Sequence, residues 1–284
     1  MSVTVIGEAF VDLIVPVYNI NPGETYHRRI EMFIGGLANV ALQISKLGER
    51  AKFVGKIGND PFGKYLKQSL KENGAEDLII IDSEAPTGLC ISLVHENGER
   101  TMIASRGAND NLSIEDVESR LSEIKNSKIV YFSGYSLLRE KTRSSVLFCI
   151  KKCHEEGLEI YFNPGAPNII KEEFKQIIKR FVDVLILNQD EAKVLVDTNL
   201  ESLIDLAKLV IVTRGGGGCT IIGKEKIVEV KTEKIFVKDS TGAGDAFSAG
   251  FIAGKLMNLS LIECAKLGNK VAKSFLKEKE RRLK

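Results

Sequence analysis

The chain has 284 residues, more than one small domain needs, and its formal net charge of +2 does not favour nucleic acid as its main partner. It has no apolar run long enough to cross a membrane and no basic start with a cleavage site, so we expect a cytoplasmic protein without a membrane partner. Its five cysteines include no Cys-x-x-Cys pair, which argues against a disulfide framework.

Apolar runs of strand length alternate with segments of helical periodicity along most of the chain. Strands are expected at 2–7, 51–58, 128–134, 158–165, 182–188 and 208–218, and helices at 37–48, 61–74, 113–124, 142–157 and 191–196. Continuous apolar strands separated by helices are typical of a parallel sheet that is buried on both faces. The sequence therefore predicts an α/β fold with a mostly parallel central sheet between helices.

Two stretches with short strands and turn residues interrupt this alternation. We interpret residues 12–33 and 87–105 as a small antiparallel sheet, a lid, that projects from a main domain made of residues 1–11, 34–86 and 106–284. A pair of ordinary surface hairpins is the alternative interpretation.

Ligands of parallel sheets bind at the carboxyl ends of the strands, where four polar or glycine-rich segments are expected. In the first, Gly35 and Gly36 would let a ligand approach backbone N–H groups, and Asn39 has the donors and acceptors that suit sugar hydroxyls. Glycine pairs before helices also occur in plain turns.

The second and third segments each follow an apolar strand. Residues 188–191 (NQDE) would face phosphate or a hydrated Mg²⁺, and an acidic helix N-terminus explains them equally well. Residues 212–218 (VTRGGGG) contain more glycines than a tight turn needs. Either a flat ligand lies against this backbone, or the glycines form a hairpin turn into the next strand.

The fourth segment, residues 239–247 (DSTGAGDAF), places glycines and an acid where an apolar helix begins. It matches neither the Walker A motif nor the dinucleotide fingerprint. The backbone N–H groups of Gly242, Ala243 and Gly244 would form an anion site at the helix N-terminus. Asp245 would then remove a proton from an attacking hydroxyl while the N–H groups hold the phosphoryl group. A hydroxyl cap with an acid in the first turn is the alternative.

Seven motifs, in this order, resemble those of the ribokinase family of carbohydrate and nucleoside kinases, also called the pfkB family. They are GEAFVD (7–12), GGLANVA (35–41), GKIGNDPFG (55–63), RGAN (106–109), NQDE (188–191), VTRGGGG (212–218) and DSTGAGDAF (239–247). The resemblance runs from Val3 to about Asn269 and implies a three-layer α/β/α fold with a β-sheet lid. It further implies a kinase that transfers the γ-phosphoryl group of a nucleotide, with ATP expected, to a hydroxyl of a small sugar or related polyol.

The resemblance also implies a role for each matching residue. Asp245 is the expected general base, and the backbone of residues 242–244 is the expected anion hole. The residues expected at the acceptor are Asp12, Gly35, Gly36 and Asn39, with Arg106 as a further candidate. Those expected at the nucleotide are Asn188, Glu191, Thr213, Gly215, Gly218 and Asn269, of which Glu191 would arrange Mg²⁺ through water. Asp239 and Thr241 would bind a monovalent cation such as K⁺, and the lid would pair two copies into a homodimer.

Three positions inside the chain depart from the family pattern. Around residues 161–165 many relatives have Asp-x-Asn-x-Arg, whereas Tyr161 and Gly165 stand here at the outer positions. The segment after residues 131–134 lacks the sugar-contacting Glu of ribokinase, which argues against ribose. Arg106 could reach an acidic or phosphorylated acceptor, although an ordinary salt bridge is the simpler expectation.

The C-terminal segment is the fourth departure. Relatives continue past the final helix with residues that help to bind the monovalent cation, whereas residues 277–284 (KEKERRLK) indicate a solvated helix end. A sugar kinase is the leading prediction, with a nucleoside kinase of the same family as an alternative. A non-catalytic nucleotide- or sugar-binding regulatory protein on the same scaffold is a further alternative. A dehydrogenase is disfavoured, because no glycine fingerprint follows the first strand.

Overall fold

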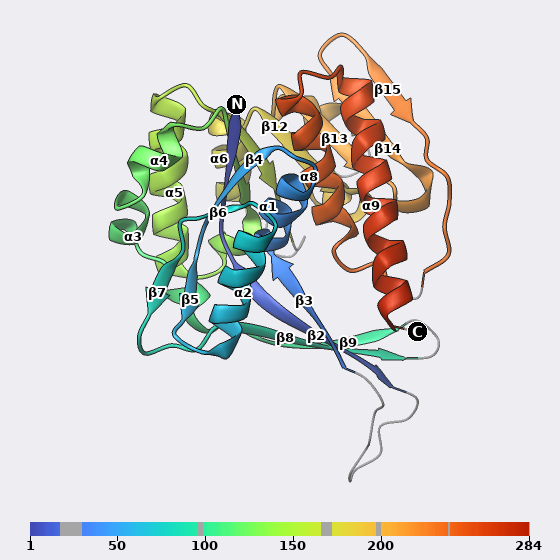
Figure 1. Cartoon of the computed structure of the whole chain (residues 1–284). Coiled ribbons are helices and arrows are strands. Elements are labelled where there is room, and N and C mark those ends of the chain that lie inside the picture. Colours follow the sequence, from blue (N-terminus) through green and yellow to red (C-terminus); the bar gives the residue numbers. More distant parts are fainter. Residues whose placement is uncertain (18–29, 96–98, 166–171, 197–199, 238, 284) are drawn as a thin grey trace.

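The computed structural model describes residues 1–17, 30–95, 99–165, 172–196, 200–237 and 239–283. These residues form a large sheet with helices on both faces and a smaller sheet that projects from one end (Figure 1). None of the helices in these ranges is both long and apolar enough to cross a membrane. The predicted three-layer fold with a separate small sheet is confirmed.

The described part of the large sheet has nine strands in the order β15-β14-β13-β12-β11-β10-β1-β4-β6. In chain order these are β1 (Ser2–Ile6), β4 (Arg50–Val54), β6 (Glu76–Asp77), β10 (Ile129–Ser133), β11 (Glu159–Asn163), β12 (Val184–Asn188), β13 (Leu209–Thr213), β14 (Cys219–Gly223) and β15 (Ile227–Val230). The strands from β13 to β6 in this order run parallel, and β14 and β15 add two antiparallel pairings at one edge. All residues of β1 and β10 are buried, which explains their continuous apolar pattern.

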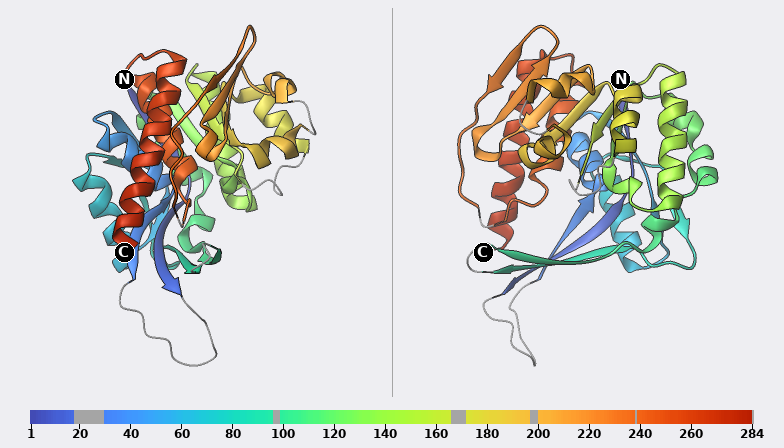
Figure 2. Two further views of the ribbon diagram at one scale, coloured as in Figure 1. Left: turned by 90° about the vertical axis from the view of Figure 1, so that its right-hand side faces the viewer. Right: turned by 180° about the vertical axis from the view of Figure 1, so that it is seen from behind.

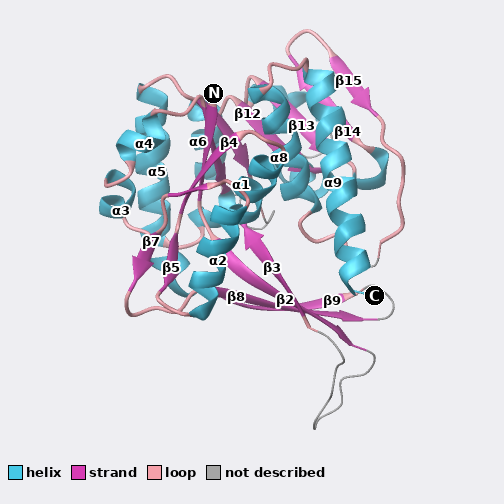
Figure 3. Cartoon of the chain, in the orientation of Figure 1, coloured by secondary structure: helices cyan, strands magenta, loops and turns pink. Residues whose placement is uncertain are grey.

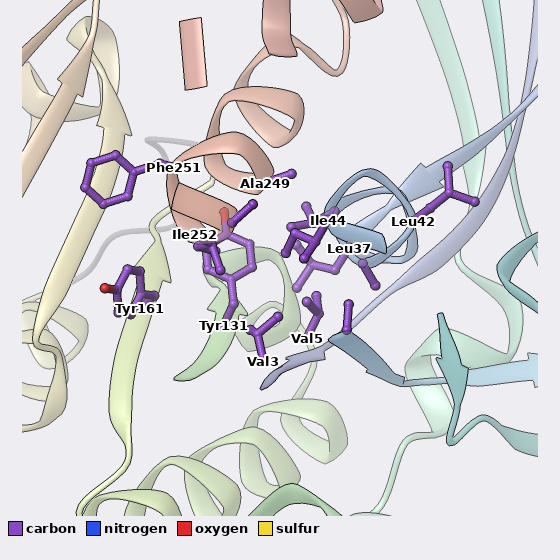
Figure 4. Close-up of a cluster of buried hydrophobic side chains, with 14 of the residues drawn as sticks. Val3, Val5, Leu37, Leu42, Ile44, Tyr131, Tyr161, Ala249, Phe251 and Ile252 are labelled. Carbon is purple, nitrogen blue, oxygen red and sulfur yellow. The ribbon is translucent and has the colours of Figure 1, made fainter. Parts of the chain in front are cut away.

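Helices cover both faces of this sheet (Figure 2). One layer contains α1 (Leu37–Lys46), α2 (Pro61–Glu72), α8 (Ala243–Leu256) and α9 (Leu261–Leu283), and the other contains α3 (Ile114–Glu118), α4 (Leu121–Lys125), α5 (Glu140–Glu155), α6 (Glu172–Phe181) and α7 (Gln189–Leu195). Alternate residues of one strand enter opposite cores, because Tyr131 packs on the α8 side whereas Val130 and Phe132 pack on the α5 side. Figure 4 shows the core on the α8 side of the sheet, where Tyr131 and Tyr161 lie next to Ile252 of α8.

Short 3₁₀ helices complete the main domain, and local signals set several of the helix starts. The 3₁₀ helices are η1 (Gly107–Asn111), η2 (Gly134–Leu137), η4 (Leu200–Asp205) and η5 (Gly215–Gly217). Helix α2 begins at Pro61 after Asp60, whose side chain accepts a hydrogen bond from the N–H of Gly63 at 2.8 Å. Helix α3 begins with a capping box between Ser113 and Asp116.

The smaller sheet, which we call the lid, has the strand order β3-β2-β8-β9. Its strands are β2 (Ala9–Val17), β3 (Glu31–Gly36), β8 (Gly88–His95) and β9 (Arg100–Ser105), which Figure 3 shows as a layer beyond the helices. The pairs β2–β3 and β8–β9 are antiparallel, whereas the middle pair, β2–β8, is parallel. A separate parallel pair joins β5 (Lys56–Gly58) and β7 (Ile80–Asp82). Residues 18–29 and 96–98 of the predicted lid lie outside the described residues.

Candidate active site

Helix α8 begins at the glycine-rich loop of residues 239–247. Gly242 is its N-cap and has φ 83°, a left-handed conformation that favours glycine. A Cβ atom at this position would lie 2.8 Å from the ring of Phe275 in α9, so glycine lets the loop pack closely. A Cβ atom on Gly244 would meet no atom within 4 Å, whereas the N–H of Ala243 is used inside the loop. Open space therefore adjoins Gly244 in the first turn of the helix, and the anion site at residues 242–244 stays a prediction.

The carboxyl group of Asp245 stands in the first turn of α8 and is partly buried. Removal from water raises the pKa of this group from 3.8 to about 7, with further contributions from the negative charges of Asp12, Glu191 and Glu8. These acids come from β2, α7 and the turn after β1, so distant parts of the chain meet here. A carboxylate with a pKa near neutrality is suited to accept a proton from an alcohol.

Asp12 and Gly35 are brought together across the β2–β3 pair. A Cβ atom on Gly35 would overlap the carboxylate of Asp12, so the glycine leaves the room that this carboxylate occupies. Burial raises the pKa of Asp12 from 3.8 to about 6, the positive charge of Lys279 opposes the rise, and Asp239 adds to it. The structure thus joins two of the residues predicted at the acceptor.

Asn39 and Gly36 lie at the start of α1. Asn39 is buried and accepts a hydrogen bond from Gln43 at 3.2 Å. A Cβ atom on Gly242 would lie 3.8 Å from its amide nitrogen, so Asn39 adjoins the loop before α8. Gly36 is the N-cap of α1 with φ 63°, and a Cβ atom there would lie 2.6 Å from the carbonyl oxygen of Glu8. Gly36 therefore lets β3 turn tightly into α1.

Arg106 is held inside the protein by two carboxylates. Its Nη2 lies 3.2 Å from Oε1 of Glu8, and its Nε donates to Oδ1 of Asp110 at 2.5 Å. Burial raises the pKa of Glu8, and the guanidinium of Arg106 opposes that rise. The expected salt bridge is therefore present, and the contact of Arg106 with an acceptor stays a prediction.

A hollow of about 810 Å³, partly open to solvent, lies between the β13–β14 hairpin, α8 and α9. Predicted residues that line it are Thr213, Gly215, Gly218, Ala243, Gly244 and Asn269. Three segments that are far apart in the sequence thus meet at one hollow. The consecutive glycines form the turn into β14 and also line this hollow.

Asn188 and Glu191 form a capping box at the start of α7. Oδ1 of Asn188 accepts from the N–H of Glu191 at 2.9 Å, and Oε2 of Glu191 accepts from the N–H of Asn188 at 2.8 Å. Burial raises the pKa of Glu191 from 4.5 to about 7, although the N–H of Asn188 opposes the rise. No group of three or more His, Cys, Asp and Glu side chains within the described ranges is arranged for a metal ion. Because Mg²⁺ usually keeps water and phosphate ligands, one fixed carboxylate fits it.

The sequence model of pfkB family carbohydrate kinases matches residues 1–282. The chain belongs to this family. It is 30% identical over 281 residues to an ATP-dependent 6-phosphofructokinase of Thermoanaerobacterium thermosaccharolyticum, covering 94% of this chain and 85% of that protein. It is 29% identical over 255 residues to fructokinase-1 of Zea mays, covering 85% and 79%.

Solved structures agree with this assignment. The adenosine kinase of Sinorhizobium meliloti has a TM-score of 0.88 at 27% identity, covering 97% of this chain and 94% of that chain. The ribokinase of Thermotoga maritima has a TM-score of 0.81 at 27% identity, covering 95% and 91%. The protein is therefore a sugar or nucleoside kinase of the pfkB family, and the predicted fold, family and enzyme class are confirmed.

The two positions near β11 that differ from the family pattern, Tyr161 and Gly165, hold residues with structural roles. Tyr161 is buried beside α8, and its hydroxyl donates to Oε2 of Glu159 at 3.2 Å. Gly165 has φ 74°, and a Cβ atom there would lie 2.8 Å from the ring of Tyr135. Neither position therefore brings a charge to the site.

Two features of the kinase site were missed. Beyond the predicted Asn269, further residues of the same face of α9 line the hollow, and their helical spacing was a usable signal: Ala272, Lys273 and Leu276. The irregular segment after β15 also lines it, and no motif marked that segment. The prediction of a solvated end at residues 277–284 is wrong for Lys279, which is buried because α9 packs on the loop before α8.

Proposed function

We propose that this kinase transfers the γ-phosphoryl group of ATP to a hydroxyl group of a neutral sugar or nucleoside, with Asp245 as the general base. The observation that carries the proposal is the position of this carboxyl group, in the first turn of α8 with a pKa of about 7. A carboxylate there can take the proton of an acceptor alcohol while backbone N–H groups of the loop stabilise the phosphoryl oxygens.

The hollow between β13, α8 and α9 fits a nucleotide donor. The amide nitrogen of Asn269 is buried there without a hydrogen-bond partner among the described residues, as expected of a group that meets a ligand. Gly215 and Gly244 leave open space where Cβ atoms would stand, so phosphates can approach the backbone. Glu191 would hold Mg²⁺ through water, and this ion would supply positive charge to the phosphates.

The charges near Asp245 favour a neutral acceptor over a phosphorylated one. The charges that shift its pKa are all negative. Two cations of this region, Arg106 and Lys279, are already paired with carboxylates. A phosphate on the acceptor would bring further negative charge to an acidic site. We therefore expect higher kcat/KM for free sugars or nucleosides than for their phosphates.

The test compares Asp245→Asn with Asp205→Asn, an exposed acid of η4. Initial rates are measured with ATP and a panel of sugars, nucleosides and their phosphates. We expect Asp245→Asn to lose at least about a hundredfold in kcat while its ATP affinity, measured by calorimetry, is kept. Full turnover by this variant would refute the assigned base. ATP binding without turnover of any acceptor by the wild type would favour a regulatory binding protein instead.

We also propose that the lid pairs two copies of the chain. Met102 and Ile103 of β9 are exposed, and β9 is an edge strand of the described lid. Exposed apolar side chains on an edge strand are typical of a surface that meets another chain. Light scattering should give twice the chain mass of 31.3 kDa. A monomer mass at micromolar concentration would contradict the pairing.

A further inference from the structure

The amino group of Lys279 is buried at a junction of three elements. Its side chain is 5% exposed and that of Asp239 is 1% exposed, and Nζ lies 2.7 Å from Oδ2 of Asp239. Nζ also donates to the carbonyl oxygen of Thr241 at 3.2 Å. It lies 5.9 Å from the ring centroid of Phe33 in lid strand β3. One ammonium group thus connects α9, the loop before α8 and the lid.

Packing of α9 sets the position of this ammonium group. Figures 1 and 2 show the C-terminal end of α9 beside the strands of the lid. One turn before Lys279, Phe275 packs against Gly242, and Leu276 lines the nucleotide hollow. The helix is therefore fixed against the loop, and Lys279 is not part of a solvated tail.

Asp239 depends on this positive charge. Its Oδ1 accepts hydrogen bonds from the N–H of Thr241 at 2.8 Å and from the Thr241 hydroxyl at 2.6 Å. Both oxygens of this buried carboxylate therefore have partners, because Oδ2 lies beside the ammonium group of Lys279 and Oδ1 accepts from Thr241. A carboxylate that is buried and charged requires a cation beside it.

Asp239 and Thr241 are also the two residues for which the family resemblance implies a monovalent cation. A carboxylate oxygen and a main-chain carbonyl oxygen suit K⁺, and an ammonium group has the same charge and a similar size. We propose that the ammonium group of Lys279 takes the place of this cation, so that the kinase needs no K⁺. Lys279 is then a positioning residue, which holds the loop that leads to Gly242 and Asp245. Because this ammonium group is covalently attached to the chain, the loop keeps its shape whatever salt is present.

The wild type supplies the first test. Thermal unfolding and kcat/KM are measured in KCl and in tetramethylammonium chloride, a cation too large for such a site, at equal ionic strength. We expect the same melting temperature and rates that agree within about twofold in the two salts. Activation by K⁺ of about fivefold or more over tetramethylammonium would overturn the proposal.

The second test compares Lys279→Ala with Lys277→Ala, which removes an exposed lysine of the same helix. In tetramethylammonium chloride we expect Lys279→Ala to melt about 5 °C or more below the control, because Asp239 is left buried without a cation. Its kcat/KM should fall about tenfold or more, because the loop is no longer held. K⁺ should restore part of both losses with a saturable concentration dependence, and it should leave the control unchanged.

A Lys279→Ala variant that matches the control without K⁺ would overturn the proposal, as would a loss that K⁺ does not reverse. If this variant does not fold, the wild-type comparison decides. The melting temperatures need no catalytic turnover, so the cation proposal can fail while the proposed function holds. The proposed function can likewise fail while the melting temperatures support the cation proposal.

Discussion

Replacing Asp245 with Asn should stabilise the folded protein at about pH 8 while it removes catalysis. The folded state holds the proton of Asp245 more tightly than the unfolded chain, because burial and neighbouring acids raise its pKa. Ionised Asp245 therefore lowers the free energy of unfolding. This cost is absent below about pH 4, grows as the pH rises to about 7, and is constant above that. The amide has no charge to bury, so the variant escapes the cost.

The size of the gain follows from the pKa. A rise from 3.8 to about 7 corresponds to about 4 kcal/mol, which is an upper limit. Part of the rise comes from Asp12 and Glu191, whose own pKa values are about 6 and about 7, so these groups share the cost as they titrate. We therefore expect a gain of about 1–3 kcal/mol at about pH 8 and less than half of it at about pH 5.

Urea unfolding at the two pH values measures this difference. The chain has no Trp, so far-UV circular dichroism is the suitable probe. Asp205→Asn is the control, because this exposed acid lies on η4 and should change stability by less than about 0.5 kcal/mol at either pH. An Asp245→Asn variant that is less stable than the wild type at about pH 8, or that gains equally at both pH values, would refute the account of this carboxyl group.

Three further predictions test the neighbouring residues. Asp245 must be ionised to accept a proton, so kcat/KM should fall about tenfold per pH unit below about pH 7. Asp12→Asn should move this acidic limb of the pH–rate profile to lower pH, because the charge of Asp12 raises the pKa of Asp245. An acidic limb that does not move would contradict this interaction between the two acids. Gly35→Ala should raise KM for the acceptor about tenfold without changing KM for ATP, because its Cβ displaces the Asp12 carboxylate, whereas Gly223→Ala should change neither. Gly218→Ala should lose about 2 kcal/mol or more of stability in urea unfolding, because this residue has φ 87° and its Cβ would overlap a backbone carbonyl; stability equal to that of Gly223→Ala would argue against this.

Features that depend on neighbouring residues could be predicted from the sequence. The start of α2 follows from Asp60 and Pro61, which act within one helical turn. Strands such as β10 were recognisable because both faces are buried, which makes the whole segment apolar. The glycine-rich loop was recognisable because its residues share one short segment.

Features that depend on distant contacts could not be predicted. For Arg106 the sequence left two interpretations open, because its partner Glu8 lies 98 residues away. Lys279 was misread because its hydrogen-bond partner Thr241 lies 38 residues earlier, and charged helix ends are usually solvated. Only the packing of α9 against the loop decides that this lysine is buried.

The same lysine distinguishes two acids of the candidate site, Asp12 and Asp245. The positive charge of Lys279 opposes the rise in the pKa of Asp12, which reaches about 6, whereas the charges that shift the pKa of Asp245 are all negative and it reaches about 7. Neighbouring carboxyl groups whose environments differ in this way take different roles. The cation beside Asp12 favours the ionised form of this group, which would accept hydrogen bonds from acceptor hydroxyls. No cation is among the charges that shift the pKa of Asp245, which stays the proposed base. Loss of Lys279 should therefore raise the pKa of Asp12 toward that of Asp245 and reduce this difference.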